Sequence, residues 1–208
     1  MSVNKYITAS CIISKNVVYK DERKVFENKE VILPDFLLSL YQHLDIKYPK
    51  FYKMDNLCKL GWLAAEILLK DSFKTDKYQP EETGVVLSNA SSSLDTDIRY
   101  YETAKDIASP ALFVYTLPNI VIGEICIRHH FKGENAFFIT EKFDAEFIEQ
   151  YAANLINNNI LQACICGWVE LLDDEYKVVL FLVEKEPSPV PMHFTNENIN
   201  KIYQLENG

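Results

Sequence analysis

The sequence predicts an α/β fold in which a mostly parallel five-stranded sheet carries helices on both faces and ends in an antiparallel strand. Five apolar runs of strand length alternate with helical segments along the 208 residues, a pattern typical of parallel strands that are buried on both faces. The last two runs are joined only by residues 171–175. This link is too short for a crossover helix, so we expect the last pair to be antiparallel.

The N-terminal part of the chain is predicted to form strands and a loop. Residues 6–14 are an apolar run, and the turn residue Asn16 leads into a short strand at 17–19. The charged segment 20–30 is expected to be a loop.

Two helices should follow this loop. Pro34 suits the first turn of a helix from residue 35 to about residue 43. The clearest helix spans residues 55–70, where small and apolar residues fall on one stripe at helical spacing and Asp55 is well placed as the N-cap. Gly61 on that stripe predicts a close neighbouring element.

The middle of the chain continues the alternation of strands and helices. A strand at 83–87 and the small polar loop 89–93 lead to a helix at 94–105. The helix expected at 117–131, with Pro118 in its first turn, is apolar nearly all round and should therefore be central to the domain.

The C-terminal part completes one domain, residues 1–185, and adds an extension, residues 186–208. The expected elements are a strand at 136–140, an amphipathic helix at 144–157, and strands at 161–169 and 176–184. Three prolines give the extension an extended start, and its last residues should either form a short helix or remain loose.

The composition indicates a globular protein with an acidic surface. Hydrophobic residues make up 48% and charged residues 25%, and the formal net charge is −9, which argues against nucleic acid as a partner. No apolar stretch reaches the ~18 residues of a membrane span, and the N-terminus lacks a signal-peptide pattern. We therefore expect a cytoplasmic protein without a membrane span.

The cysteines are expected to be reduced and mostly buried, with no metal or cofactor bound. The five positions are Cys11, Cys58, Cys126, Cys164 and Cys166. Cys164 and Cys166 are separated by one residue and have no second pair or clustered His nearby, so they do not predict a zinc site.

Several short strings resemble those of β-ketoacyl synthases, which have the thiolase-like fold. Lys53-Met54-Asp55 resembles their Arg-Met-Asp helix entry, and Gly84-Val85-Val86 resembles their next strand. Pro118-Asn119 resembles the Pro-Asn or His-Asn that opens a buried helix in the family. The segments 151–156 and 163–170 resemble a later helix and strand. The resemblance covers residues 5–172 and implies a thiolase-like half-fold, the N-terminal half of a ketosynthase.

The resemblance also places the family's nucleophile, which lies in a Thr-Ala-Cys string. Aligned without gaps from Gly133, Thr140 matches the Thr, Glu141 the Ala and Lys142 the Cys. The chemistry needs a thiolate at a helix N-terminus, where N–H groups lower the thiol pKa and hold the oxyanion, and a lysine does not supply one. We therefore assign no catalytic residue, and Lys142 occupies the nucleophile slot.

The family's His-His or His-Asn pair and its Lys come from a C-terminal half that, by resemblance, would lie beyond Gly208. His129 and His130 are not expected to replace them, because adjacent helical side chains point about 100° apart. We expect one to pack or cap the helix and the other to be solvated.

These deficits favour a non-catalytic ketosynthase-like subunit of a fatty acid, polyketide or aryl-polyene type pathway. By resemblance, the strand 136–140 would pair across a two-fold axis with a second copy or with a full-length ketosynthase. Acyl carrier protein is a further candidate partner, although an acidic surface repels it unless cations are clustered.

Two alternatives remain open. The chain could be a 3-oxoacyl synthase-like acyltransferase that is active only in a heterodimer, or an acyl-chain binding module. If the chain is an enzyme, the residues that could act as base or nucleophile are Glu141, Lys142, His129, His130 and Ser91 to Ser93. By itself, the chain is not expected to be an enzyme.

Overall fold

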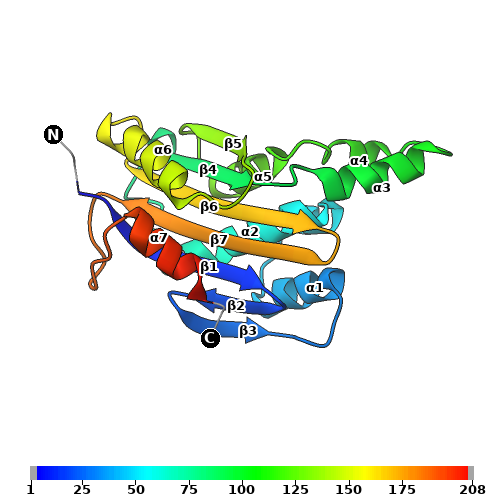
Figure 1. Ribbon diagram of the computed structural model, residues 1–208, viewed down its shortest axis with the longest axis horizontal. Coiled ribbons are helices and arrows are strands. Elements are labelled where there is room, and N and C mark those ends of the chain that lie inside the picture. Colours follow the sequence, from blue (N-terminus) through cyan, green and yellow to red (C-terminus); the bar gives the residue numbers. More distant parts are fainter. Residues whose placement is uncertain (1–3, 206–208) are drawn as a thin grey trace.

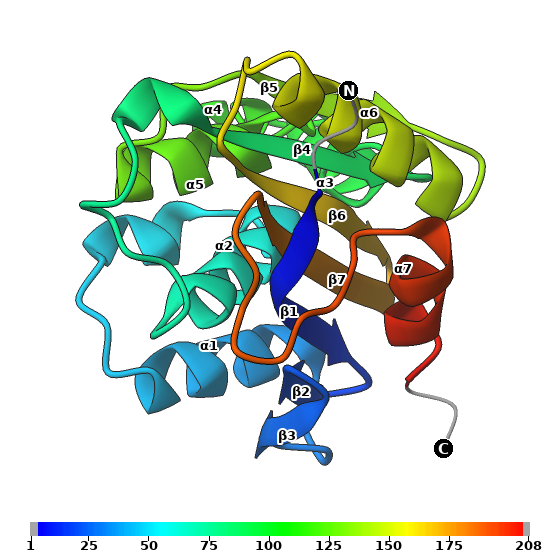
Figure 2. The same cartoon turned by 90° about the vertical axis from the view of Figure 1, so that its left-hand side faces the viewer.

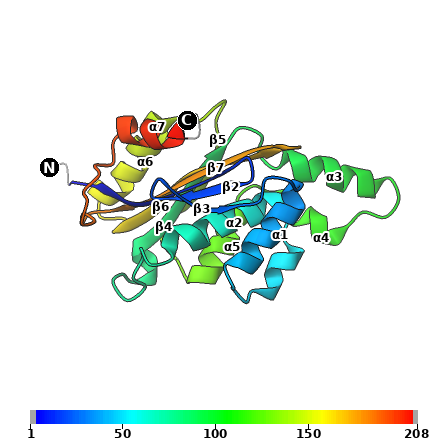
Figure 3. The same cartoon turned by 90° about the horizontal axis from the view of Figure 1, so that it is seen from below.

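The computed structural model describes residues 4–205, which form three layers with one sheet between two sets of helices (Figures 1 and 3). The strands are β1 Tyr6–Ser14, β2 Val17–Lys20, β3 Arg23–Glu27, β4 Thr83–Asn89, β5 Asn135–Ile139, β6 Ala163–Leu172 and β7 Glu175–Glu184. The α-helices are α1 Leu33–His43, α2 Asn56–Leu69, α3 Leu94–Ala104, α4 Pro110–Phe113, α5 Ile120–His129, α6 Ala145–Asn157 and α7 Asn196–Tyr203. Short 3-10 helices lie at Pro49–Lys53 and Pro80–Glu82.

The predicted five-stranded, mostly parallel sheet is wrong in strand number and in pairing. The sheet has seven strands in the order β3-β2-β1-β7-β6-β4-β5. β4 pairs in parallel with β5 and β6, whereas the other four neighbouring pairs are antiparallel. The antiparallel last pair, β6 with β7, is confirmed. Because β7 lies between β6 and β1, β1 meets an antiparallel neighbour although it runs in the same direction as β4, β5 and β6.

The segment 20–30, predicted to be a loop, contains β3 at the edge of the sheet. Asp21 and Glu22 turn the chain with φ of 48° and 65°. The Asp21 carboxylate accepts a hydrogen bond from Ser10 N at 2.8 Å, and Asp21 N donates to Ser10 O at 3.0 Å. The charges that favoured a loop are equally suited to an exposed edge strand, where they discourage pairing with another chain.

We expect Glu22→Gly to stabilise the protein, because a left-handed φ costs a residue with a Cβ roughly 1 kcal/mol. Part of that gain is lost to the greater freedom of glycine in the unfolded chain, so a net increase of about 0.5 kcal/mol in the free energy of unfolding is expected. Urea denaturation measures it. The matched control is Glu27→Gly, at a position in β3 without positive φ, which should destabilise; equal effects of the two changes would contradict the explanation.

The predicted helices are present, with two adjustments. Asp55 caps α2 as expected, its Oδ1 accepting from Cys58 N at 2.8 Å. A Cβ on Gly61 would overlap Val121 of α5, which identifies the close neighbour that the small residue predicted. Pro118 lies just before the N-cap Asn119 rather than in the first turn of α5, so the apolar helix is shorter than predicted. The separate helix α4 was not predicted.

Two apolar clusters hold the layers together. One lies between the sheet and α1, α2 and α5, and the other lies between the sheet and α6 and α7 (Figure 3). Part of the extension 186–208 belongs to the second cluster, because Phe194, Ile199 and Ile202 are buried in it. Of the two outcomes predicted for the last residues, the structure shows the short helix, α7.

Candidate functional site

The loops that carry most of the candidate residues lie at one edge of the sheet. β4, β5 and β6 are parallel, so their carboxyl ends meet at the same edge, where α/β proteins commonly bind ligands. The loop 90–93 follows β4, and the loop 140–144 follows β5. Thr140 N donates to Asn89 O at 2.9 Å, which holds the two loops side by side.

Lys142 is exposed in the loop between β5 and α6, two residues before the N-cap of that helix. Its own carbonyl accepts a hydrogen bond from Thr140 Oγ1 at 3.0 Å. The N-cap is Asp144, whose Oδ1 accepts from Phe147 N at 2.9 Å. The first turn of α6 is thus capped by a carboxylate of the chain itself, and this geometry does not favour an oxyanion at the same place. Glu141, next to Lys142, is exposed as well.

The three serines form a turn rather than a nucleophilic site. The side chain of Asn89 accepts from Ser92 N at 3.0 Å and donates to Ser92 O at 2.8 Å. Ser93 is buried, and its Oγ donates to Thr116 O at 2.8 Å. The Ser93 hydroxyl also lies 3.3 and 3.4 Å from the two carboxylate oxygens of Asp97, in the first turn of α3. Because the Ser93 side chain is buried and its shortest bond is to a backbone carbonyl, these bonds fit the interpretation of the serines as a helix-entry loop.

Glu170 of β6 is part of this edge and was missed by the sequence analysis. Its Oε2 accepts from Ala90 N at 2.6 Å and from Ser91 N at 3.3 Å. A carboxylate of the chain therefore occupies backbone donors that could otherwise face a negatively charged ligand. The available signal was a charged Glu inside an otherwise apolar strand. Its partners Ser91 and Ala90 are 79 and 80 residues away in the sequence.

His129 and His130 precede β5 and Lys142 follows it, so that the five-residue strand, roughly 17 Å long, separates the two ends of the sheet at which they lie. His129 Nε2 lies 3.0 Å from Glu66 Oε1, and Arg128 Nε donates to the same oxygen at 2.9 Å. Burial opposes ionisation of Glu66, but these partners lower the pKa of its carboxyl. His130 is the exposed left-handed C-cap of α5, with φ of 60°. The structure therefore separates this pair from the serines and Lys142.

Four of the five cysteines are unsuited to act as a replacement nucleophile at neutral pH, and the fifth, Cys164, is buried. Burial raises the pKa of the Cys126 thiol to about 11, and it also raises the pKa values of the Cys11, Cys58 and Cys166 thiols. All but Cys126 are fully buried. Thiols held in the neutral form are weak nucleophiles.

We therefore expect slow reaction of the native protein with a thiol reagent such as 5,5′-dithiobis(2-nitrobenzoate) at pH 7, beginning at Cys126 because its side chain is the only partly exposed one of the five. All five should react quickly in guanidinium chloride. Mass spectrometry after partial labelling identifies the site, and rapid native labelling of any other cysteine would contradict the assignment.

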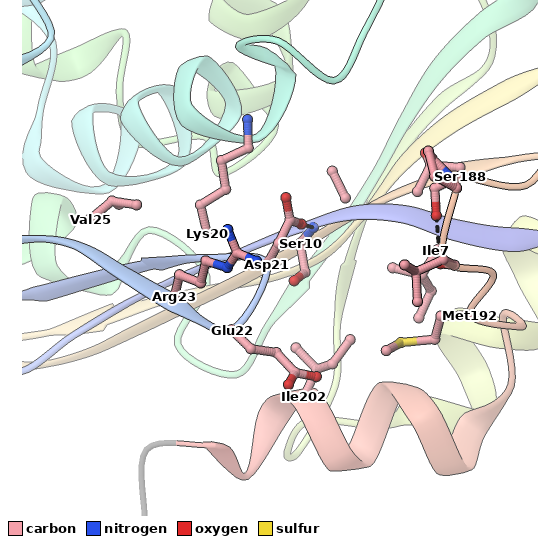
Figure 4. Close-up of a pocket in the computed structure, with 14 residues that line it drawn as sticks. Ile7, Ser10, Lys20, Asp21, Glu22, Arg23, Val25, Ser188, Met192 and Ile202 are labelled. Carbon is pink, nitrogen blue, oxygen red and sulfur yellow. Dashed lines mark hydrogen bonds between the residues drawn. The ribbon is translucent and has the colours of Figure 1, made fainter.

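A groove of about 700 Å³ lies away from this edge, beside β1 (Figure 4). Ile7 and Ser10 of β1, the turn at Asp21 and Glu22, and Met192 of the extension border it. The Lys20 amine donates to the carbonyl of Lys70, at the end of α2. None of the candidate residues lines this groove, so it does not extend the site at the carboxyl ends of the strands.

No helix within residues 4–205 is long and apolar enough to cross a membrane. No group of three or more His, Cys, Asp and Glu side chains in the same range is arranged to hold a metal ion.

Solved structures identify the fold, whereas sequence comparison does not. No protein-family model matches the chain, and no curated protein matches it either. The ishigamide ketosynthase/chain length factor matches 87% of this chain with a TM-score of 0.65 and 18% sequence identity. The chain has the thiolase-like fold of a ketosynthase.

Two other structures with the ketosynthase fold describe assemblies. A type II PKS acyl-carrier protein in complex with its ketosynthase bound to the hexaketide matches with a TM-score of 0.60 and 16% identity over 88% of this chain. A ketosynthase (ApeO) in complex with its chain length factor (ApeC) from Xenorhabdus doucetiae matches with a TM-score of 0.55 and 12% identity, also over 88%.

The fraction of the matched chain that the alignment covers differs among the three structures. The alignment spans 62% of the matched ishigamide chain and 64% of the matched chain in the acyl-carrier protein complex, so the present chain covers less than two-thirds of those proteins. In the ApeO–ApeC complex it spans 80% of the matched chain, which is therefore of similar length to this one.

Proposed function

We propose that this chain is a non-catalytic subunit with the ketosynthase fold, which pairs with a full-length ketosynthase in a polyketide or aryl-polyene type pathway. The proposal rests on the position that the resemblance assigns to the nucleophile, where an exposed Lys142 precedes a helix capped by its own Asp144. Thioester chemistry needs a thiolate held by helix N–H groups, and the five cysteines lie elsewhere in the fold. Two of the matched structures are described as a ketosynthase with a chain length factor, which supports the pairing.

The two edges of the sheet differ in their capacity to pair with another chain. β3 forms one edge and carries Arg23, Lys24 and Glu27. β5 forms the other edge and reads Asn-Ala-Phe-Phe-Ile, without a charge. Charged edge strands resist edge-to-edge pairing, whereas uncharged apolar ones invite it. The strand that the resemblance places at the two-fold axis is thus the edge better suited to pairing.

The backbone of β5 has donors and acceptors that face away from β4. Glu134 O accepts from Val85 N at 3.2 Å, and Thr140 N donates to Asn89 O at 2.9 Å, so these two residues face β4. Sides alternate along a strand, and the N–H and C=O of one residue of a parallel strand point to the same side. Asn135, Phe137 and Ile139 therefore direct their N–H and C=O groups outward.

An exposed apolar arm adjoins the same end of the sheet. α3 and α4 extend beyond the carboxyl ends of the strands (Figure 1). Between 44% and 85% of each of the following side chains is exposed: Leu94, Ile98, Tyr101, Ile107, Phe113, Val114 and Leu117. Apolar surface gathered in this way is typical of protein–protein contacts. That an acyl carrier protein binds to this surface, or to another surface of the chain, stays a prediction.

Co-expression with a full-length ketosynthase from the same cell tests the proposal. We expect the tagged chain to retain the ketosynthase on an affinity column and to elute with it from a sizing column as a complex of one copy each. The chain alone should not condense acyl carrier protein thioesters with malonyl donors. Elution as a monomer at micromolar concentration in the presence of the ketosynthase, or condensation by the isolated chain, would overturn the proposal.

A further inference from the structure

Residues 192–203, which we call the C-terminal strap, fold back onto the beginning of the chain. Ile7 N donates to Met192 O at 2.8 Å, and Phe194 N donates to Lys5 O at 2.9 Å. Tyr6 and His193 form an antiparallel bridge between these bonds, and their rings lie 5.0 Å apart. The strap therefore begins as a short added strand along β1.

The helix of the strap, α7, is fixed at both ends. Asn196 N donates to Glu149 Oε2 of α6 at 2.7 Å. At the other end, the Tyr203 ring is stacked on the Phe143 ring with centroids 3.8 Å apart, and Lys177 Nζ of β7 donates to Tyr203 O at 2.8 Å. Phe143 directly follows Lys142, so the strap also holds the loop at the nucleophile slot.

The strap completes the cover of one face of the sheet. Three helices cover the opposite face, whereas α6 and α7 alone cover this one (Figures 2 and 3). Phe194, Ile199 and Ile202 are 3%, 0% and 1% exposed, and they pack in one cluster with side chains of β1 and β7 such as Ile7 and Phe181. Without the strap, this apolar part of the sheet would face solvent, and each Å² of apolar surface uncovered would cost about 25 cal/mol of free energy.

We infer that the strap is a self-docked cover that closes this sheet face to any second chain. The identity of the second chain rests on the proposed function. In that case a ketosynthase pairs at β5, and no half-domain of another chain packs on the face that α6 and α7 cover. The strap also immobilises the loop 141–144 through Phe143.

The test uses the full-length chain with Ile202→Asp, and Asn200→Asp as the matched control on the exposed side of α7. A buried carboxylate without a partner is costly, so Ile202→Asp should undock the strap while the control leaves it docked. By hydrogen exchange, we expect the amides of 193–203 and 141–144 to exchange about tenfold faster or more in Ile202→Asp alone. The uncovered face should also bind an apolar dye.

Unchanged exchange at 141–144 and unchanged dye binding in a folded Ile202→Asp protein would overturn the inference. If that variant does not fold, Tyr203→Ala removes the stack on Phe143 together with the contact between the ring and Lys177 Nζ, and it should still accelerate exchange at 141–144. No acceleration there overturns the inference as well. These readings need no ketosynthase. Failure of the wild-type chain to pair would therefore reject the proposed function and leave the result for the strap standing.

Discussion

Replacing Ile139 with proline should abolish co-elution with a ketosynthase and leave the subunit folded. Ile139 is 53% exposed in the edge strand, and its N–H points away from β4. Proline removes that outward donor without touching the β4–β5 ladder, and an edge strand tolerates it. If β5 pairs edge to edge with the ketosynthase, the lost bond and the added ring should weaken the complex by a factor of 100 or more, roughly 3 kcal/mol.

The matched control is Ile139→Thr, which keeps the donor and the strand preference while removing apolar surface. It should retain most of the binding. Circular dichroism and urea denaturation show whether each variant is folded, and analytical ultracentrifugation gives the affinity. Wild-type affinity in a folded Ile139→Pro protein would exclude β5 as the pairing edge.

Asp55→Ala should lower the free energy of unfolding by about 2 to 3 kcal/mol, because two bonds are lost at once. Asp55 Oδ1 caps α2, and Oδ2 accepts from Thr96 Oγ1 at 2.5 Å, so one buried side chain joins α2 to the arm that begins with α3. Alanine leaves the hydroxyl of Thr96, which is buried, without this acceptor. Hydrogen exchange across 94–117 should rise as well, because the arm loses a tether.

Asp55→Asn removes the charge of the side chain and can keep both of its hydrogen bonds. Asparagine can cap α2 with its oxygen and donate its amide to Thr96, so it should be close to the wild type at low pH. Burial raises the pKa of Asp55, although Thr96 and Cys58 N oppose the shift. The folded state thus binds the proton more tightly than the unfolded state, and the wild type loses stability as pH rises from about 4 through the raised folded pKa.

The stability of Asp55→Asn relative to the wild type should therefore increase between pH 4 and pH 7. Urea denaturation at both values measures this difference. If the difference in the free energy of unfolding between Asp55→Asn and the wild type is the same at both pH values, burial does not destabilise the Asp55 charge. If Asp55→Ala and Asp55→Asn have nearly equal free energies of unfolding, the lost hydrogen bonds do not explain the effect of Asp55→Ala.

The sequence was informative where a feature depends on residues close together in the chain. The Asp55 cap needs only its own residue and the next three, and its position was predicted. The stripe containing Gly61 predicted a close neighbour, which is Val121. The resemblance to ketosynthases was carried by short strings and agrees with the fold of solved ketosynthases, although no family model matches.

The candidate site was only partly predictable. The place of Lys142 between the strand at 136–140 and the helix at 144–157 was predicted, but the role of Asp144 as the cap of that helix was not. Glu170 was missed because its partners Ala90 and Ser91 are distant in sequence and the bonds involve their backbone N–H groups. A backbone donor leaves no mark in the residue types, so only the fold reveals where it points.

By itself, the sequence determined the buried strands and the main helices, because each rests on local periodicity; that Lys142 stands at the nucleophile position stays a prediction from the resemblance. Only the tertiary structure decided the order of the strands, with β7 between β1 and β6, the charged strand at one edge and β5 at the other. It also decided that the strap covers a sheet face. Pairing between distant strands is selected by the burial of the whole sheet rather than by any one segment, so a local pattern does not contain it.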